Sequence, residues 1–349
     1  MANQLVGKRK VGDTVLLKKK DMHRLVEALA DEHNIFGPVR KDGQVVFSRI
    51  AQATELDYYV NSMMSPKKYL HRPREIILSG HIGDGFLAEE SIPDRKQVLM
   101  AVKPCDVHAI LYLDKVFNHD FQDPYYNARR EKTFIVGLNC TEVGENCFCS
   151  SMDTGPELKE GYDLLLTNLG DRYTVDVGSE AGVEIVERIG LEDAQISDAM
   201  LKLRKIRVAR EQMSKRLNTK DLPQILRANL GHIYWPQVGE ECLGCANCVM
   251  VCPTCYCYNV VDQVDMSLKN VERIRSWDSC QVLDFAAVSG GNFRKEQATR
   301  MKQFVCHKLS YSLDQYGLFG CVGGGRCITW CPAEIDITKV AQEIRGGES

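Results

Sequence analysis

Residues 242–253 read CLGCANCVMVCP, and this short stretch decides how the C-terminal part of the chain is organised. Its cysteines follow the spacing C-x2-C-x2-C-x3-C-P, in which three thiolates on one tight loop can bind three corners of an iron–sulfur cube. The fourth cysteine stands directly before proline and can bind a second cluster. Zinc is the weaker alternative, because zinc sites usually draw their four ligands from two separated pairs of Cys or His residues.

A second motif follows near the C-terminus, where residues 321–332 read CVGGGRCITWCP. It would repeat the first motif if position 324 held cysteine, but Gly324 stands there. We expect the crossed pairing of two-cluster ferredoxins, and therefore two [4Fe–4S] clusters. This pairing assigns the first cluster to Cys242, Cys245, Cys248 and Cys331, and the second to Cys252, Cys321 and Cys327.

The second cluster lacks one cysteine under this pairing, and three hypotheses stay open. Another cysteine replaces the ligand at 324, or the site holds a [3Fe–4S] cluster, or water or a non-cysteine side chain completes a labile four-iron cluster. The further cysteines nearby in sequence are Cys255, Cys257, Cys280 and Cys306. We expect the replacement to be Cys306, because it is the candidate just upstream of the incomplete motif.

Two basic side chains upstream of the second motif and a run of glycines inside it also need an interpretation. His307 and Lys308 admit two interpretations: they adjust the potential of a cluster through hydrogen bonds or charge, or they are ordinary residues of a helix surface. The run Gly323-Gly324-Gly325 lies between expected cluster ligands. We expect these glycines to permit a close approach of the backbone and not to bind phosphate.

Four further cysteines lie in the N-terminal part of the chain, in two groups that each follow a probable strand. They are Cys105, Cys140, Cys147 and Cys149. Strand ends on one rim of a sheet are where ligand sites tend to form. We therefore expect a third [4Fe–4S] cluster there, with buried structural cysteines as the alternative.

The overall composition favours metal ligation over disulfides. The chain has 349 residues and an odd number of cysteines, fifteen, and it begins without the apolar segment of a signal peptide. Its formal net charge of -3 gives no reason to expect nucleic-acid binding. No apolar run approaches the roughly 18 residues that a membrane helix needs. We expect a cytoplasmic protein without direct membrane insertion.

The rest of the chain predicts a domain that contains a sheet. Apolar residues recur at helical spacing over 20–33, and a charged helical pattern covers 192–218. Strand-like stretches occupy 75–78, 98–102, 133–138, 164–167 and 173–177, the last two joined as a hairpin. We expect an α/β or α+β domain over 1–220, and then a mainly helical ferredoxin-like domain over 221–349 with the two clusters.

Taken together, these motifs resemble the dicluster iron–sulfur family that includes the sulfhydrogenase beta subunit, the corresponding subunit of anaerobic sulfite reductase and the equivalent subunit of flavin oxidoreductase–heterodisulfide reductase complexes. The resemblance covers most of the chain. It rests on CLGCANCVMVCPTCYC (242–257), WDSC (277–280), HK (307–308), CVGGGRCITWCP (321–332), GPV (37–39), KPCD (103–106), NC (139–140), CFC (147–149) and SMDTGP (151–156).

The resemblance implies an electron carrier within a hetero-oligomer. A flavin subunit that handles NAD(P)H stands on one side, and a catalytic redox subunit of the hydrogenase, sulfite reductase or heterodisulfide reductase type stands on the other. The family has cysteine where this chain has Gly324, which puts the ligation of one cluster in doubt. The alternative function is that of a reductase acting directly on a small substrate at the under-ligated cluster.

Overall fold

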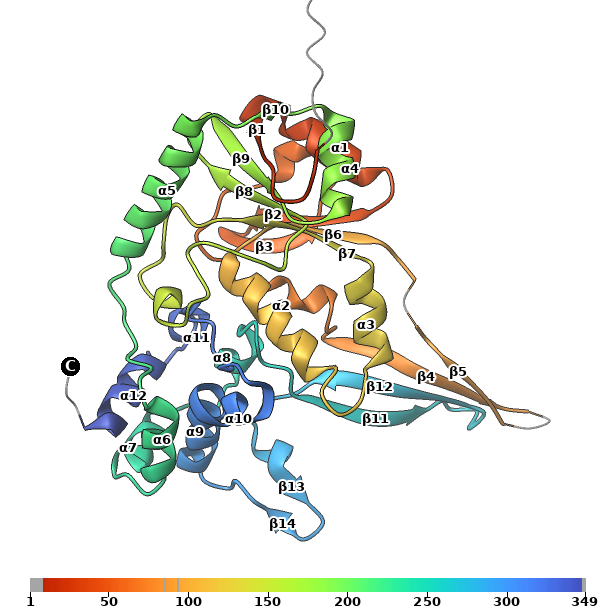
Figure 1. Cartoon of the computed structure of the whole chain (residues 1–349). Helices are drawn as coiled ribbons and strands as arrows, with labels where there is room; N and C mark the ends of the chain where they lie inside the picture. The colour runs from red at the N-terminus through yellow and green to blue at the C-terminus, as the bar shows by residue number, and fades with distance from the viewer. Residues whose placement is uncertain (1–8, 84–85, 93, 347–349) are drawn as a thin grey trace, which may run out of the picture.

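The computed structural model describes residues 9–83, 86–92 and 94–346. Its largest element is an eight-stranded sheet with the strand order β10-β1-β9-β8-β7-β6-β2-β3 (Figure 1). Strands β2, β6, β7 and β8 run parallel to one another, and the outer strands on both sides pair antiparallel. The strands are β1 (Thr14–Lys18), β2 (Asn34–Lys41), β3 (Gln44–Arg49), β6 (Gln97–Val102), β7 (Thr133–Leu138), β8 (Leu164–Asn168), β9 (Arg172–Val177) and β10 (Glu192–Asp193).

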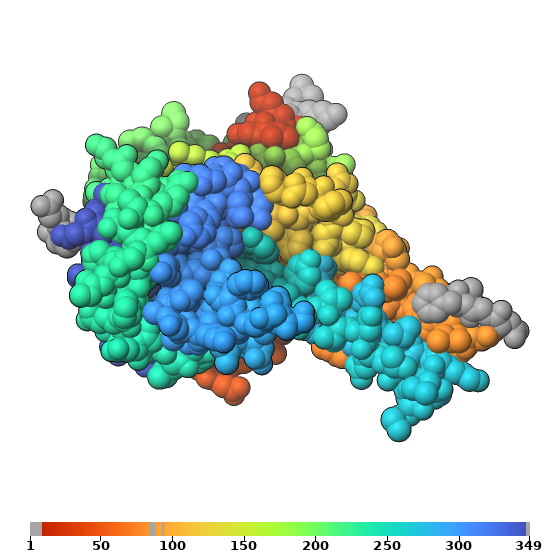
Figure 2. Space-filling model, turned by 90° about the horizontal axis from the view of Figure 1, so that it is seen from below, coloured from red at the N-terminus to blue at the C-terminus, as the bar shows by residue number. Residues whose placement is uncertain are grey.

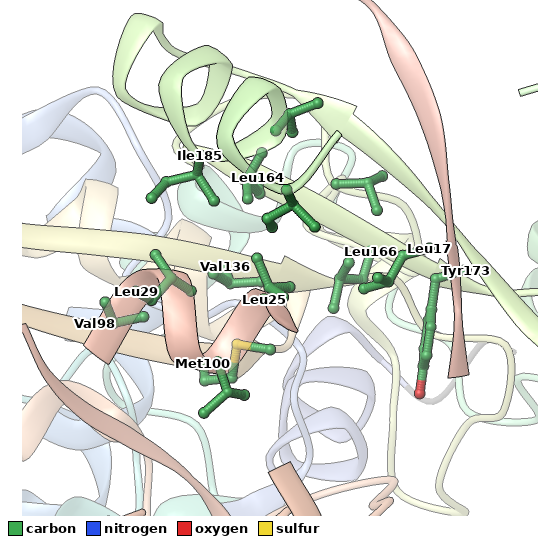
Figure 3. Packing of buried hydrophobic residues seen from close by; sticks show 14 of the residues in the cluster. Leu17, Leu25, Leu29, Val98, Met100, Val136, Leu164, Leu166, Tyr173 and Ile185 are labelled. Atoms are coloured by element: carbon green, nitrogen blue, oxygen red, sulfur yellow. The ribbon is translucent and has the colours of Figure 1, made fainter. Parts of the chain in front are cut away.

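Helices cover both faces of this sheet, which explains why its central strands are near-continuous apolar runs. On one face lie α1 (Met22–Ala30) and α4 (Glu180–Ile189), and on the other lie α2 (Pro104–Val116) and α3 (Pro124–Glu131). Figure 3 shows Leu25 and Leu29 of α1 packed with Val136 and Leu164 of the sheet. The mixed α/β architecture and the β8–β9 hairpin are as the sequence predicts.

A second sheet is antiparallel, with the order β11-β12-β4-β5. Its strands come from distant parts of the chain: β4 (Arg74–Ile82), β5 (Phe86–Glu90), β11 (Tyr258–Val264) and β12 (Asn270–Trp277). Figures 1 and 2 show it projecting from the body as an arm. The buried carboxylate of Glu75 lies at its base and pairs with Arg275, at 2.6 Å, and with Arg129.

This sheet joins segments from both sides of residue 220. The region 221–349 therefore contributes strands as well as helices, and the expectation that it is mainly helical is not confirmed. Residues 287–288 form β13 (Ala287–Val288) and pair with β14 (Gly291–Asn292). The domain limits at 220 and 221 stay a prediction.

The remaining helices gather below the large sheet around Trp235, Leu226, Phe304 and Val340, which are all buried. They are α6 (Leu222–Ala228), α7 (Tyr234–Glu241), α8 (Asn247–Met250), α9 (Gln297–Cys306), a π-helical segment (His307–Tyr311), α10 (Ser312–Tyr316), α11 (Arg326–Thr329) and α12 (Ile337–Arg345). The exposed α5 (Ile196–Glu211) connects them to the sheet, as the charged pattern predicts. Short 3-10 turns occupy Lys19–Asp21, Ala53–Glu55, Pro66–Tyr69, Cys149–Ser151 and Leu283–Ala286. None of the helices in the described ranges has the length and apolar character needed to cross a bilayer.

Candidate metal centres

The first candidate centre is a pocket at the meeting point of the two cysteine motifs. Its lining includes all four thiols that the sequence assigns to the first cluster: Cys242, Cys245, Cys248 and Cys331. Cys242 follows α7, and the left-handed residues Gly244 and Ala246 turn the loop so that Cys248 enters α8. The two short helices α8 and α11 lie in contact and bring the two motifs together.

Polar groups in this pocket point at the sulfurs. Gln297 Nε2 donates to Cys242 Sγ at 3.3 Å, and the backbone N–H of Ile335 donates to Cys331 Sγ at 3.3 Å. The rest of the wall is mostly apolar and includes Met301 and Phe304, although Asn247 and Gln281 also line it. Burial raises the pKa of Cys248 to about 12. This burial disfavours a free thiolate. Iron binds the thiolate form, and its positive charge would offset the cost of burying that negative charge.

Among the described residues, no group of three or more Cys, His, Asp and Glu side chains is arranged around the position of a single metal ion. A cubane has a different requirement, because its four thiolates bind four separate iron atoms and so surround a volume. Four thiols lining one mostly apolar pocket are the donor set that a [4Fe–4S] cluster takes. The residues present therefore fit this group.

The second candidate centre surrounds the buried side chain of Lys308. Its Nζ donates to Cys252 Sγ, to Thr254 Oγ1 and to the carbonyl of Gly320, each at 3.1 Å. Burial lowers the pKa of Lys308, but the thiolates of Cys252, Cys255 and Cys321 outweigh burial and hold this pKa above its usual range. Of the two interpretations of Lys308, the one that places a positive charge beside a ligand sulfur agrees with this geometry.

The three thiols that the sequence assigns to the second cluster lie together in this region. Cys252 and Cys321 are buried, and both lie near enough to Cys327 that, together with its burial, they raise the pKa of the Cys327 thiol. Cys327 also lines the first pocket. The first and second thiol groups are therefore neighbours.

Cys306 does not join these groups. It is fully buried in the apolar core around α9, where its thiol shares a hydrogen bond with Tyr311, and it lines none of the thiol pockets. Two residues along a helix turn the side chain by about 200°, so Cys306 faces away from the side on which Lys308 lies. The geometry therefore does not support Cys306 as the replacement ligand.

The three remaining candidates for the missing ligand line a pocket beside Lys308. They are Cys255, Cys257 and Cys280. The hairpin of β11 and β12 brings the last two together, because Tyr258 pairs with Trp277 and the N–H of Asp278 donates to the carbonyl of Cys257. The available sequence signal was the alternation of strand-forming residues on both sides of a turn at 265–269.

The third candidate centre lies at the carboxyl ends of β6 and β7 in the large sheet. Its pocket is lined by all four N-terminal thiols: Cys105, Cys140, Cys147 and Cys149. Cys105 is in the first turn of α2, directly after β6, and Cys140 follows the neighbouring parallel strand β7. Burial raises the pKa of all four thiols. The structure thus brings these residues together as expected, while their ligation of iron stays a prediction.

The glycine run 323–325 lies directly against the third candidate centre. A Cβ on Gly323 would lie 2.6 Å from the backbone N and Cα of Cys149, and one on Gly325 would lie 2.2 Å from the carbonyl oxygen of Asn146. Both glycines have positive φ, of 61° and 74°. The N–H of Phe148 donates to the carbonyl of Gly323 at 2.8 Å. The expected close approach of the backbone is confirmed.

A buried ion pair fixes this contact. The guanidinium of Arg326 donates to both carboxylate oxygens of Asp106, at 2.8 and 2.7 Å, and to the carbonyl of Ser62 at 2.8 Å. Asp106 follows Cys105 in the third group, and Arg326 precedes Cys327 in the second. The second and third thiol groups are therefore held next to each other by residues adjacent to their own thiols.

The comparisons with known proteins agree with these thiol groups. Residues 241–335 match the model of the 4Fe-4S dicluster domain. The chain is 35% identical over 324 residues to the sulfhydrogenase 2 subunit beta of Pyrococcus furiosus. The aligned residues cover 91% of this chain and 94% of that protein. No solved structure matches the chain. This chain belongs to the family of the sulfhydrogenase beta subunit, and it is an iron–sulfur, electron-transfer subunit of an oxidoreductase complex.

Proposed function

We propose that this chain relays single electrons through [4Fe–4S] clusters between a flavin subunit that handles NAD(P)H and a catalytic redox subunit. The observation that carries the proposal is the arrangement of the thiols. Two complete sets of four and one set of three lie in adjoining parts of the fold. The sulfhydrogenase relative favours a hydrogenase as the catalytic partner over sulfite reductase and heterodisulfide reductase.

Iron–sulfur clusters supply one-electron transfer at potentials that the protein adjusts through charge, burial and hydrogen bonds to sulfur. This chain's own residues provide each of these. Lys308 places a positive charge beside Cys252 Sγ, and Gln297 donates to Cys242 Sγ. Apolar side chains such as Phe304 line the first pocket. The chain needs no residue for bond-making chemistry in this role.

The exposure of the thiols suggests an order for the relay. Cys245 of the first group is exposed, whereas Cys252 and Cys321 of the second group are buried. The second group adjoins the first through Cys327 and the third through Arg326. The three centres then form a series in which the second lies between the first and the third. A partner would exchange electrons at the exposed Cys245, while the second centre stays buried.

A direct reductase is the second candidate function, and one observation favours it. A pocket beside the second group is lined by the polar groups of Lys308, His307 and Thr254 together with three thiols. A small substrate would meet a cation and thiols there. A relay subunit isolated alone should reduce only dyes, whereas a reductase should turn over a physiological acceptor such as sulfite or polysulfide.

Anaerobic isolation of the native complex through this chain tests the proposal. We expect a flavin-containing chain and a catalytic redox chain to co-purify, and NAD(P)H to reduce the clusters only while the flavin chain is present. Reduction of a physiological acceptor by the chain alone would overturn the relay and support the direct reductase. The cytoplasmic location that the sequence predicts is part of this proposal.

A further inference from the structure

The second thiol group has three members. The direction in which a side chain at position 324 would point argues against this position as the source of the fourth. A Cβ built on Gly324 would lie 3.3 Å from Cys105 Sγ, and Gly324 lines the pocket of the third group. Its carbonyl accepts from Asn61 Nδ2 at 2.7 Å, which holds this orientation. A side chain at 324 would therefore point at the third centre and not at the second.

The turn from Cys252 to Cys255 is held against the second group by two buried lysines. Lys67 Nζ donates to the carbonyls of both Cys252 and Cys255, at 2.7 Å each. Thr254, inside the turn, donates to the carbonyl of Gly320 at 2.7 Å. Lys308 Nζ donates both to Thr254 Oγ1 and to this same carbonyl. Because Gly320 directly precedes a thiol of the second group, these bonds place the whole turn beside that group.

The side chain of Cys255 follows from this backbone. Its thiol shares a hydrogen bond with that of Cys252. It also lines the same pocket as Lys308. The thiols of Cys257 and Cys280, at the base of the hairpin arm, instead share a hydrogen bond with each other.

We infer that Cys255, and not Cys306 or a residue at 324, is the fourth thiolate of the second [4Fe–4S] site. The inference rests on the proposed function, because it requires that the thiols hold iron. The site then consists of Cys252, Cys255, Cys321 and Cys327. Gly324 is not a lost ligand of this site, and the second cluster has four cysteine ligands, as an ordinary [4Fe–4S] cluster does.

The test compares single variants of the full chain, isolated anaerobically and analysed for iron, sulfide and EPR signals. C255S should lose between about one and about four iron atoms per chain, depending on whether the cluster becomes a three-iron cluster or is lost. Its spectrum should change accordingly, with the signal of a three-iron cluster or without that of the second centre. C306S, C257S and C280S are the matched controls and should keep the iron content of the unmodified chain.

Two results would overturn the inference. One is a C255S variant with unchanged iron and spectra, and the other is an equal loss of iron in C257S, C280S or C306S. An unmodified chain without iron and sulfide would instead overturn the proposed function. The two failures are therefore distinguishable.

A labelling experiment on the unmodified chain keeps the test decisive if C255S does not fold. Cys255, Cys257 and Cys280 line the same pocket and are each partly exposed as residues, so the reaction of their thiols with a small alkylating reagent can be compared. We expect Cys255 to react only after iron is removed, while Cys257 and Cys280 react before. Alkylation of Cys255 with the iron content intact would contradict the assignment.

Discussion

At the scale of single residues, the buried charges explain how thiolate-rich sites are tolerated inside this fold. Lys308 is 5% exposed and yet has three polar partners, all within 3.1 Å. A buried ammonium is costly unless it is paired and hydrogen-bonded. Its Nζ lies beside the thiol of Cys252. The fold therefore holds a positive charge where the second group would carry negative thiolates.

Replacement of Lys308 by methionine tests this role. Loss of the positive charge should disfavour the reduced, more negative form of the second centre, and so lower its midpoint potential. We expect a shift on the order of 60 mV, a tenfold change in a one-electron equilibrium. A redox titration followed by EPR measures it, with K302M on α9 as the control. An unchanged potential in K308M would show that the charge does not act on this centre.

Asp106→Asn tests the ion pair between the second and third thiol groups. The variant leaves Arg326 buried and uncompensated, because both partners are almost fully buried. We expect an apparent loss of about 3–5 kcal/mol in the free energy of unfolding. Denaturant unfolding under anaerobic conditions measures this loss.

The control for D106N is the exposed carboxylate of Asp193, the partner of Arg9. D193N should cost less than about 1 kcal/mol, because its carboxylate is exposed to water and Arg9 keeps a hydrogen bond to the carbonyl of Leu191. Equal effects of D106N and D193N would contradict the account of Arg326 as a buried link.

At the scale of elements, the loop 321–327 is the connection between the C-terminal and N-terminal thiol groups. Its glycines leave no room for side chains where the loop meets the segment 146–149. Sequence spacing predicted which thiols of the first group would meet, because a short C-x2-C-x2-C loop determines its own geometry. The same spacing suggested that position 324 belongs to the second centre, whereas a Cβ on Gly324 would lie 3.3 Å from Cys105 Sγ, a tertiary contact that spacing cannot predict.

Gly323→Ala tests the loop. The new Cβ would lie 2.6 Å from the backbone of Cys149, so the loop or the segment 146–149 has to move. We expect the third centre to lose its iron, which lowers the iron content by about four atoms per chain. Gly290→Ala is the control, since a Cβ there meets nothing within 4 Å. Full iron content in G323A would contradict the close packing.

The helix that carries Cys306 shows a second limit of inference from sequence. Closeness along the chain suggested Cys306 as a ligand, but the helical turn directs it into the apolar core around Phe304. The central strands were predictable because burial on both faces gives continuous apolar runs. The pairing of β12 with β4 was not, because these two strands are far apart in the sequence and their partner choice leaves no local pattern.

At the scale of the whole molecule, the two predicted domains are joined by more than a linker. The arm pairs β4 with β12, and the ion pair of Asp106 and Arg326 joins the thiol groups. These contacts hold the third centre beside the second, and the short helices α8 and α11 hold the second beside the first. A relay needs fixed neighbours of this kind, because the protein's part in electron transfer is to position each centre and adjust its potential.

The central claim is that the thiols hold iron and inorganic sulfide. The most direct test is iron and acid-labile sulfide analysis of the full chain, isolated without exposure to oxygen. We predict about twelve iron atoms and as many sulfides per chain, from three [4Fe–4S] clusters. About eight of each would show that the third thiol group holds no cluster. A chain that contains no inorganic sulfide would contradict the electron relay itself.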